Sequence, residues 1–324
     1  MPNDTIIKAL KDLRLPQPNS HKGQNGKVLL IGGSELFHAA SKWSLDVVSR
    51  LTDMVFYASV PSNNELIKHA KSEFWNGIVI RREEMFSYIE EADCILIGPG
   101  MERDENKMSA TEPEILDQFT AENWNTNTKA VVDTLLHRYP NKKWVIDAGA
   151  LQMVAPSLLN KNCILTPHYK ELRAVYEKLP KSSYNFGDFE PDLRADDGFT
   201  PFNVSLSKNM SKELGGATLL IKGMVDIVAN GDEGTTIAGG TPGMTKGGTG
   251  DVLAGLVAGL YATNDAWTAA VVGSYINKKT GEELAKTVGP FFNASDLAAK
   301  IPEVLWGEYS KTNSPIAGNQ LSSD

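Results

Sequence analysis

Hydrophobic residues along the chain form short continuous runs that alternate with amphipathic stretches. Residues 27–33 predict a buried strand followed by a turn, residues 40–51 fit an amphipathic helix, and residues 55–60 predict the next strand. Continuous apolar strands separated by helices are typical of a mainly parallel sheet that is covered on both faces. We expect further strands at residues 77–81, 94–97, 144–147, 163–166, 218–222, 226–230 and 235–238.

The C-terminal half of the pattern differs from the rest. The strands expected after residue 218 follow one another with no helical stretch between them, which predicts an antiparallel edge to the sheet. Three helical stretches then follow, at residues 251–262, 265–288 and 295–309. We therefore expect one α/β domain over residues 1–310. Residues 179–202 are polar and turn-rich, which predicts a surface insertion, and the composition of residues 311–324 predicts a flexible tail.

Composition narrows the class of protein. The 324 residues are 41% apolar and 22% charged, which are ordinary globular values, and the net charge of −8 argues against nucleic-acid binding. The longest apolar stretch is too short to span a membrane, and the N-terminus has no signal-peptide pattern. We interpret Cys94 and Cys163 as buried, reduced thiols rather than as metal ligands or a disulfide. A cytoplasmic protein without a membrane or nucleic-acid partner is expected.

Small or polar residues follow five of the expected strands. In a doubly wound sheet, ligands bind beyond the carboxyl ends of the parallel strands. Any one of these segments alone is explained by turn formation, but the parallel topology would gather all five on one edge of the sheet. That edge is the predicted binding site. The segments are residues 32–34, 98–100, 147–149, 166–168 and 222–223.

The most informative segment is Gly247-Gly248-Thr249-Gly250-Asp251, directly before an apolar helix. Backbone amides at a helix N-terminus form an anion site that the helix dipole reinforces. Asp251 could be only an N-cap, or it could accept a proton from a hydroxyl that attacks a bound phosphate. No Lys-Ser/Thr pair follows the glycines, so the segment is not a P-loop.

Residues 247–255 (GGTGDVLAG) resemble the anion-hole and catalytic-aspartate signature of the ribokinase-like superfamily. Six further segments resemble, in family order, the motifs of the ADP/ATP-dependent NAD(P)H-hydrate dehydratases. Within one of them, Thr166-Pro167-His168 with Glu171 separates this family from sugar and vitamin kinases. The six segments are residues 21–34, 97–101, 145–148, 165–171, 221–223 and 242–244.

The resemblance implies a ribokinase-like three-layer α/β sandwich and a metabolite-repair activity. In the family, ATP or ADP phosphorylates the ring hydroxyl of hydrated NADH or NADPH, and phosphate is then eliminated, so the enzyme is a carbon–oxygen lyase. A homo-oligomer is expected, since relatives with this fold commonly assemble and Trp306 could supply contact surface.

The resemblance also assigns roles to individual residues. Asp251 would be the catalytic base, assisted by the amides of Gly248, Thr249 and Gly250. The substrate would contact Ala40, Gly100, His168 and Asp251. The nucleotide would contact Lys222, Gly223, Asp226 and Gly250. Asp147 and Glu171 would organise Mg²⁺ and its waters.

The chain departs from the family pattern at several positions. His38-Ala39-Ala40 stands where Gly-Ala is usual, Asp226 replaces a threonine, Thr241 replaces an asparagine, and Lys246 adds a charge before the glycines. Asp226 would repel phosphate unless Mg²⁺ or Lys222 offsets it, or it is simply an exposed turn charge. His168 could be an ordinary residue at a strand end, although the motif favours a contact with the ligand, and Trp43 is interpreted as packing.

Two other functions remain open from the sequence. One is a small-molecule kinase of the same fold, and the other is a catalytically weakened nucleotide-binding homologue. Because the first motif begins at residue 21, we also expect the chain to lack the epimerase domain of bifunctional members.

Overall fold

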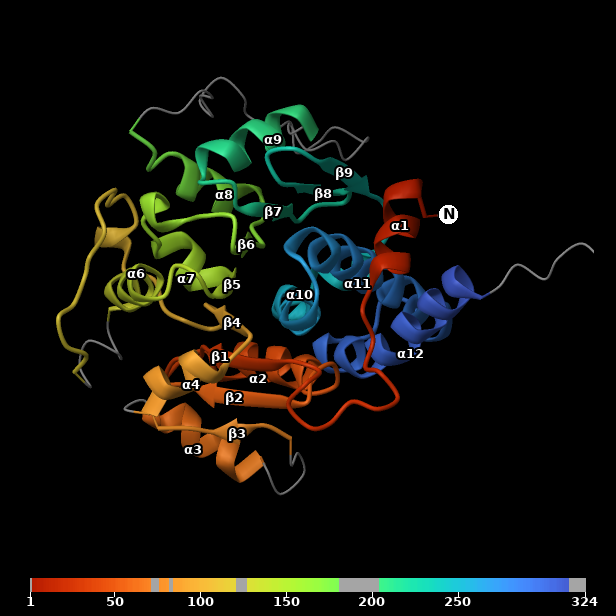
Figure 1. Ribbon diagram of the computed structural model, residues 1–324, viewed down its shortest axis with the longest axis horizontal. Helices are drawn as coiled ribbons and strands as arrows, with labels where there is room; N and C mark the ends of the chain where they lie inside the picture. Colours follow the sequence, from red (N-terminus) through yellow and green to blue (C-terminus); the bar gives the residue numbers. More distant parts are fainter. Residues whose placement is uncertain (1, 71–75, 82–83, 121–126, 181–203, 315–324) are drawn as a thin grey trace, which may run out of the picture.

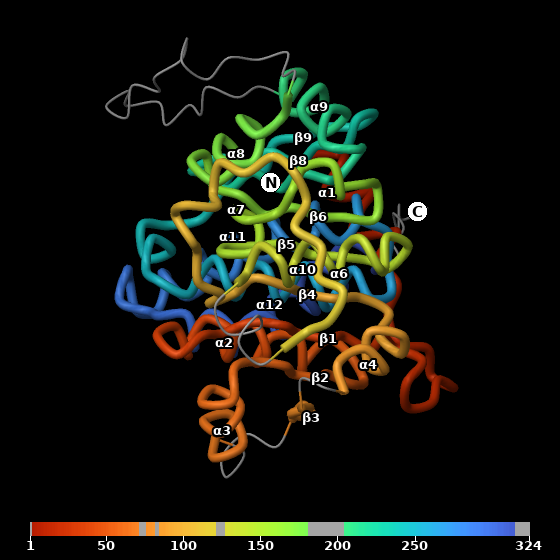
Figure 2. The backbone as a smooth tube through the Cα atoms, turned by 90° about the vertical axis from the view of Figure 1, so that its left-hand side faces the viewer, coloured from red at the N-terminus to blue at the C-terminus, as the bar shows by residue number. Residues whose placement is uncertain are grey.

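The computed structural model describes residues 2–70, 76–81, 84–120, 127–180 and 204–314, and these contain one nine-stranded sheet. Its spatial order is β3-β2-β1-β4-β5-β6-β7-β8-β9. The strand labels follow this order from bottom to top in Figure 1, and Figure 2 shows the same stack from the side, from β3 at the bottom to β9 at the top. The strands are β1 (Lys27–Ile31), β2 (Met54–Ala58), β3 (Ile78–Val79), β4 (Cys94–Ile97), β5 (Lys143–Ile146), β6 (Cys163–Leu165), β7 (Thr218–Ile221), β8 (Asp226–Ala229) and β9 (Gly234–Ile237).

All pairs from β3 through to β7 are parallel, and β8 and β9 are antiparallel additions at one edge. The expected antiparallel edge is therefore confirmed. The connections at residues 222–225 and 230–233 are too short for the crossover that a parallel neighbour needs.

Helices cover both faces of the sheet and complete a three-layer sandwich (Figure 1). The helices that pack on one face are α1 (Asp4–Asp12), α2 (His38–Val48), α3 (Pro61–Ala70), α10 (Thr249–Thr263), α11 (Ala266–Val288) and α12 (Ala294–Asn313). Those on the other face are α4 (Met85–Glu91), α6 (Thr128–Arg138), α7 (Ala148–Met153), α8 (Tyr169–Tyr176) and α9 (Val204–Glu213). Successive side chains of a strand alternate between the faces, so Val28 and Leu30 join the first core, whereas Leu29 and Ile31 join the second.

Helix α10 is buried along almost its whole length and lies directly against α2. A side chain at Gly255 would place its Cβ 2.7 Å from the carbonyl oxygen of Ser44, so only glycine allows this approach. The close contact holds the N-terminal turns of α2 and α10 beside each other at the carboxyl edge of the sheet.

Some expected boundaries differ from the structure. Strand β3 is shorter than the expected 77–81, and Lys311, Thr312 and Asn313 belong to α12 rather than to a tail. The proposed insertion at 179–202 and the remaining tail fall almost entirely outside the described residues. Both cysteines are free and buried, as expected. Among the described helices, none has the length and apolar character needed to cross a membrane.

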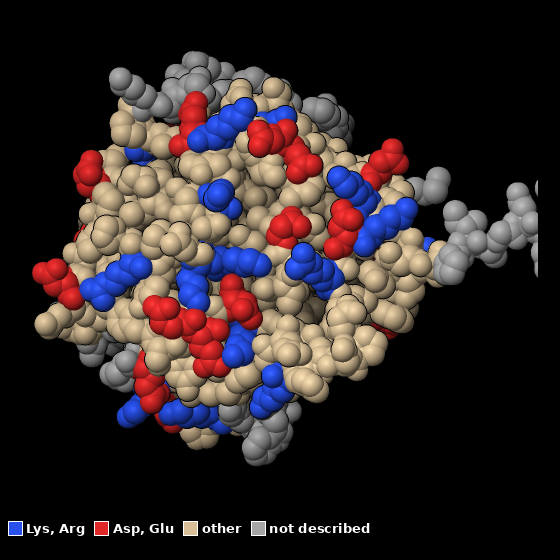
Figure 3. Space-filling model, viewed as in Figure 1, with Lys and Arg blue, Asp and Glu red and all other residues tan. Residues whose placement is uncertain are grey.

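Lys and Arg lie among Asp and Glu over the face of the molecule shown in Figure 3. Among the described residues, that face therefore carries no continuous patch of a single charge.

Candidate active site

The five strand-end segments meet at one edge of the sheet, as the parallel topology predicts. Backbone hydrogen bonds join them: Gly33 N donates to Pro99 O at 2.7 Å, and Lys222 N donates to Pro167 O at 2.8 Å. Gly98 has φ +123°, and a Cβ there would lie 1.8 Å from the carbonyl oxygen of Asp147. The glycine of this segment is therefore required by the close approach of the β4 and β5 ends.

The N-terminus of α10 presents open backbone amides. Gly248 is the N-cap with φ +95°, and the amides of Gly248 and Gly250 donate to no acceptor within the described residues. The Thr249 hydroxyl lies 2.7 Å from the Met244 carbonyl oxygen and 2.9 Å from that of Lys246, which fixes the turn. Unpaired amides at the positive end of a long helix form a site for an anion.

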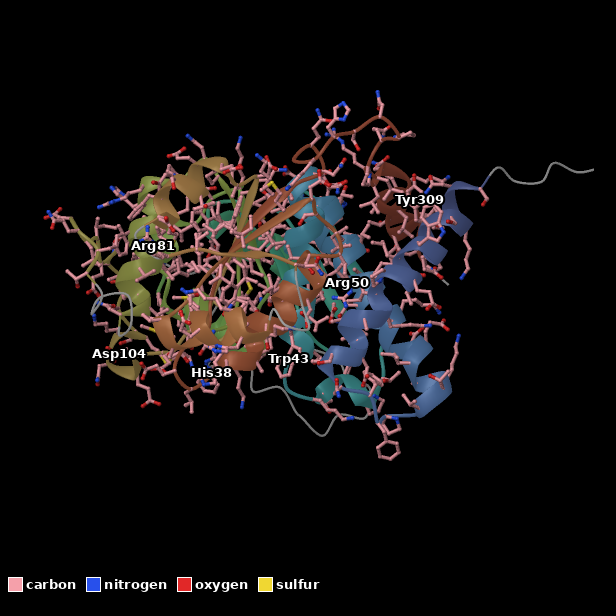
Figure 4. The ribbon with its side chains drawn as sticks, turned by 90° about the horizontal axis from the view of Figure 1, so that it is seen from below. His38, Trp43, Arg50, Arg81, Asp104 and Tyr309 are labelled. Atoms are coloured by element: carbon pink, nitrogen blue, oxygen red, sulfur yellow. The ribbon has the colours of Figure 1, made fainter. Side chains whose placement is uncertain are left out.

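Trp43 supports this turn from α2. A Cβ at Gly248 would lie 2.4 Å from its indole ring, and its Nε1 donates to Ser295 Oγ at 3.1 Å. Figure 4 shows Trp43 at the junction of α2 with the C-terminal helices. Trp43 is thus a packing residue, as expected.

Asp251 is the third residue of α10, so its interpretation as the N-cap is wrong. Burial raises the pKa of its carboxyl to about 7, and the negative charge of Asp147 adds to this, while Lys222 opposes it. A carboxylate with a pKa near neutrality, beside an anion site, can accept a proton from a bound hydroxyl.

Lys222 lies between the two residues that were expected to organise Mg²⁺. Its Nζ is 3.1 Å from Asp147 Oδ1 and 3.7 Å from Glu171 Oε2. Burial alone would lower the pKa of Lys222, but the two carboxylates raise it, so the ammonium stays charged. A Cβ at Gly250 would be 3.5 Å from this Nζ, which places the positive charge next to the open amides.

His168 is the N-cap of α8. Its Nδ1 accepts a hydrogen bond from Glu171 N at 3.2 Å, and Glu171 Oε2 accepts one from His168 N at 2.9 Å, so the two residues form a capping box. Partial burial lowers the pKa of the imidazole, whose side chain is 53% exposed. His168 therefore has the structural role of a helix cap, and its imidazole also lies close enough to Lys222 and Asp147 for their charges to act on its pKa.

The remaining substrate residues lie near the same helix ends. A Cβ at Gly100 would be 3.2 Å from Ala40 Cβ. Ser44 Oγ, one turn beyond Ala40 on α2, lies 2.8 Å from the Asp251 carbonyl oxygen and 3.4 Å from that of Ala40. The structure thus brings Ala40, Gly100 and Asp251 together.

Asp226 is not the exposed turn charge that the sequence left open. It is 4% exposed, and its carboxylate lies 3.2 Å from Lys278 Nζ and accepts hydrogen bonds from Gly223 N and Ser274 Oγ. Lys278, rather than Lys222, offsets its charge. Burial raises the pKa of Asp226, and Lys278 opposes that shift.

A cavity of about 450 Å³ adjoins the N-terminus of α10 and includes all four expected nucleotide residues in its lining. Sequence motifs missed Asn277 and Lys278, which also line it from α11. The one available signal was a pair of polar residues directly after the apolar run of residues 269–272 and 275–276. The cavity is lined by residues 222–224, 226, 239–242, 244–245, 249–250, 253 and 277–278.

Comparison with known proteins agrees with this geometry. Residues 28–303 match the family model described as NAD(P)H-hydrate dehydratase. An ADP-dependent (S)-NAD(P)H-hydrate dehydratase of Nitrosopumilus maritimus is 31% identical over 315 residues, which cover 94% of this chain and 98% of that protein. A bifunctional NAD(P)H-hydrate repair enzyme of Methanocaldococcus jannaschii is 31% identical over 303 residues, covering 91% of this chain and 51% of that protein. The chain thus spans about half the length of the bifunctional relatives that it matches.

Solved structures show the same fold at lower identity. The ADP/ATP-dependent NAD(P)H-hydrate dehydratase of Bacillus subtilis, co-crystallised with ATP/Mg²⁺, has a TM-score of 0.69 at 20% identity and covers 94% of this chain and 97% of its own. A ribokinase-like superfamily protein of Enterococcus faecalis has a TM-score of 0.68 at 21% identity, covering 93% and 94% of the two chains. The fold is therefore ribokinase-like, and by its family match and its 31% identical relatives this chain belongs to the NAD(P)H-hydrate dehydratase family.

Proposed function

We propose that this chain repairs hydrated NADH or NADPH by a dehydration that ADP or ATP drives. The observation that carries the proposal is one arrangement: Asp251, with a pKa of about 7, beside the unpaired amides of Gly248 and Gly250 and the ammonium of Lys222. A base, an anion site and a fixed cation are the parts that phosphoryl transfer to a hydroxyl needs.

In the first step, the ring hydroxyl of the hydrated nicotinamide attacks the terminal phosphoryl group of the nucleotide. Asp251 accepts the hydroxyl proton as the new O–P bond forms, and the bond to the departing nucleotide breaks. The unpaired amides of Gly248 and Gly250 hold the phosphoryl oxygens, and Lys222 balances their charge. The Thr249 amide, which was also expected to contribute, already donates to Lys246 O at 3.4 Å. Ala40, Gly100 and His168 are the residues we assign to the substrate.

In the second step, phosphate leaves with the ring oxygen. The carbon–oxygen bond breaks, a proton is lost from the neighbouring ring carbon, and the dihydropyridine ring is restored. Phosphorylation makes this possible because phosphate is a far better leaving group than hydroxide. The overall reaction is thus that of a nucleotide-consuming carbon–oxygen lyase.

The nucleotide would occupy the cavity lined by Lys222, Gly223, Asp226 and Gly250. The word ADP-dependent in the name of the Nitrosopumilus relative, together with its (S) prefix, supports ADP as co-substrate and the S epimer as substrate. The name of the Bacillus subtilis enzyme leaves ATP as the alternative.

Mg²⁺ fits this site as a partner of the nucleotide. Within the described residues no three potential ligands cluster into a metal site, but Mg²⁺ commonly takes one or two carboxylates and completes its shell with waters and phosphate oxygens. Asp147 and Glu171 would contact it through its waters, since their carboxylates also hold Lys222. When bound, Mg²⁺ would neutralise phosphate charge.

One assay separates this function from its alternatives. The protein is incubated with hydrated NADH and either ADP or ATP, and the absorbance of restored NADH is followed. We expect NADH to appear only when nucleotide is present, with one phosphate released per NADH. A small-molecule kinase would consume nucleotide only with another alcohol, and a weakened binding homologue would bind nucleotide without producing NADH; either result would contradict the proposal.

The expected homo-oligomer is also a proposal. Trp306 is 63% exposed and stacks on Tyr309, with ring centroids 6.1 Å apart, beside a second cavity at the opposite edge of the sheet. Sedimentation of the full chain at micromolar concentration should give a mass above the monomer mass of 35.3 kDa. The substitution Trp306→Glu should lower this measured mass. A monomeric wild-type protein would refute this assembly.

A further inference from the structure

Two buried polar atoms in the proposed nucleotide cavity have no hydrogen-bond partner within the described residues. They are Asn277 Oδ1 and Thr241 Oγ1, and both residues line the cavity. Asn277 is 5% exposed. Buried polar atoms are nearly always hydrogen-bonded in folded proteins, so an unpaired side-chain oxygen in the lining of a cavity indicates a ligand that donates to it.

Lys278, the next residue on α11, also lines the cavity, but unlike Asn277 Oδ1 its polar atom is hydrogen-bonded within the protein. Lys278 Nζ donates to the carbonyl oxygens of Gly223 at 2.9 Å and Met224 at 3.0 Å, and its ammonium lies 3.2 Å from Asp226 Oδ1. Its bonding capacity is used by the protein itself, and it fixes one wall of the cavity. Within the described residues Asn277 Oδ1 makes no such contact, so this oxygen remains available to a ligand in the cavity.

The rest of the lining suits a flat aromatic ring. Met224, Pro242, Met244 and Leu253 contribute apolar surface, and the cavity volume of about 450 Å³ lies within the usual range for small-molecule sites. Lys222 and Gly250 mark the phosphate end, because they adjoin the open amides of α10. A nucleotide with its phosphates there would direct its base into the remaining, mostly apolar space.

From this arrangement we infer that the side-chain amide of Asn277 reads the donor–acceptor edge of adenine and so selects the base of the nucleotide. The inference rests on the proposed use of ADP or ATP. An amide offers a donor and an acceptor side by side, and these pair with the exocyclic amino group of adenine and its adjacent ring nitrogen. Guanine presents a carbonyl oxygen in place of that amino group.

The substitution Asn277→Asp tests this reading directly. Aspartate has the same size but only acceptors, so it loses the bond to the adenine ring nitrogen. It can instead accept from both N–H donors on the Watson–Crick edge of guanine. The matched control is Asn141→Asp, an exposed asparagine at the far edge of the sheet, which adds the same charge.

Binding of ADP and of GDP to the full chain is measured by calorimetry, without hydrated NADH. We expect the wild type and Asn141→Asp to prefer ADP, and Asn277→Asp to shift the ratio of the two dissociation constants towards GDP by about tenfold or more. An unchanged ratio in a folded Asn277→Asp protein would overturn the inference. If that variant does not fold, Asn277→Leu should bring the ratio towards one, and an unchanged ratio there would overturn it equally.

The design separates this inference from the proposed function. A wild type that binds ADP selectively through Asn277 but restores no NADH would refute the dehydratase and leave base selection standing. A wild type that restores NADH while the Asn277 variants keep its base preference would refute base selection alone. A wild type that binds neither nucleotide would contradict both.

Discussion

Lys222 Nζ, just after β7, lies 3.1 Å from Asp147 Oδ1, just after β5, so this ion pair reaches across the end of the intervening strand β6. This ion pair controls the charge around Asp251: Asp147 raises the pKa of the Asp251 carboxyl, and Lys222 lowers it. The proposed base and anion site are therefore linked electrostatically to residues from two strands that are 75 positions apart in the sequence.

The pH dependence of the reaction should report this link. Because Asp251 must be ionised to accept a proton and its pKa is about 7, kcat/KM should rise between pH 6 and pH 8. Asp147→Asn keeps an acceptor for Lys222 and Thr166 but removes the negative charge, so the acid limb should move to lower pH. The dependence of kcat/KM on pH is measured for the wild type and for Asp147→Asn. If the rise in kcat/KM stays at the same pH in the variant, or moves to higher pH, the proposed link between Asp147 and Asp251 is contradicted.

The glycines before α10 should differ sharply in their tolerance of alanine. At Gly248, with φ +95° and the Trp43 ring 2.4 Å from a Cβ, alanine is strained and must displace the indole. We expect Gly248→Ala to lose about 1–3 kcal/mol of unfolding free energy and most of its activity. Gly247→Ala is the matched control, since nothing lies within 4 Å of a Cβ there. Equal effects of the two substitutions, measured by urea unfolding and by rate, would argue against a tightly fixed turn.

The Asp226–Lys278 pair should be important for stability. Lys278→Met leaves Asp226 buried without its cation, and breaking a buried pair in this way costs about 3–5 kcal/mol. Asp226→Asn in the same protein should recover part of the loss. As the control, Lys300→Met removes the more exposed pair with Glu303 and should cost about 0–1 kcal/mol. Denaturant unfolding of the three variants measures these differences; a Lys278→Met loss no larger than the control's would show that the pair contributes little.

Sequence reasoning found the parts of the site that lie within short motifs. The strand-end segments could be predicted because parallel topology places every strand end at the same edge, and Gly98 or Gly248 is needed where backbones or rings come close. The pairing of Asp226 with Lys278 could not be predicted from the sequence. The two residues are 52 positions apart, and only the packing of α11 against β8 brings them together. Asn277 was missed for the same reason, and the capping role of Asp251 was wrong because Gly248 begins the helix one turn earlier.

The raised pKa of Asp251 also predicts how stability changes with pH. The folded protein holds this proton up to a pH of about 7, whereas the unfolded chain releases it near 3.8. The contribution of this group to stability is therefore fully present below pH 3.8 and is lost as the pH rises through 7. Asp251→Asn cannot ionise, so above pH 7 it should be at least as stable as the wild type. Thermal unfolding of both proteins at pH 5 and pH 8 tests this, and a variant that is less stable at pH 8 would contradict it.

The central claim is that Asp251 is the base, and the rate of NADH restoration by Asp251→Asn tests it most directly. The variant keeps the size of the side chain, and because Asp251 is not the N-cap, the helix start should be unaffected. We predict that kcat falls by about 10²–10⁴, as for the loss of a general base, while ADP affinity and the fold are retained. A folded Asp251→Asn protein that restores NADH at close to the wild-type rate would contradict the mechanism.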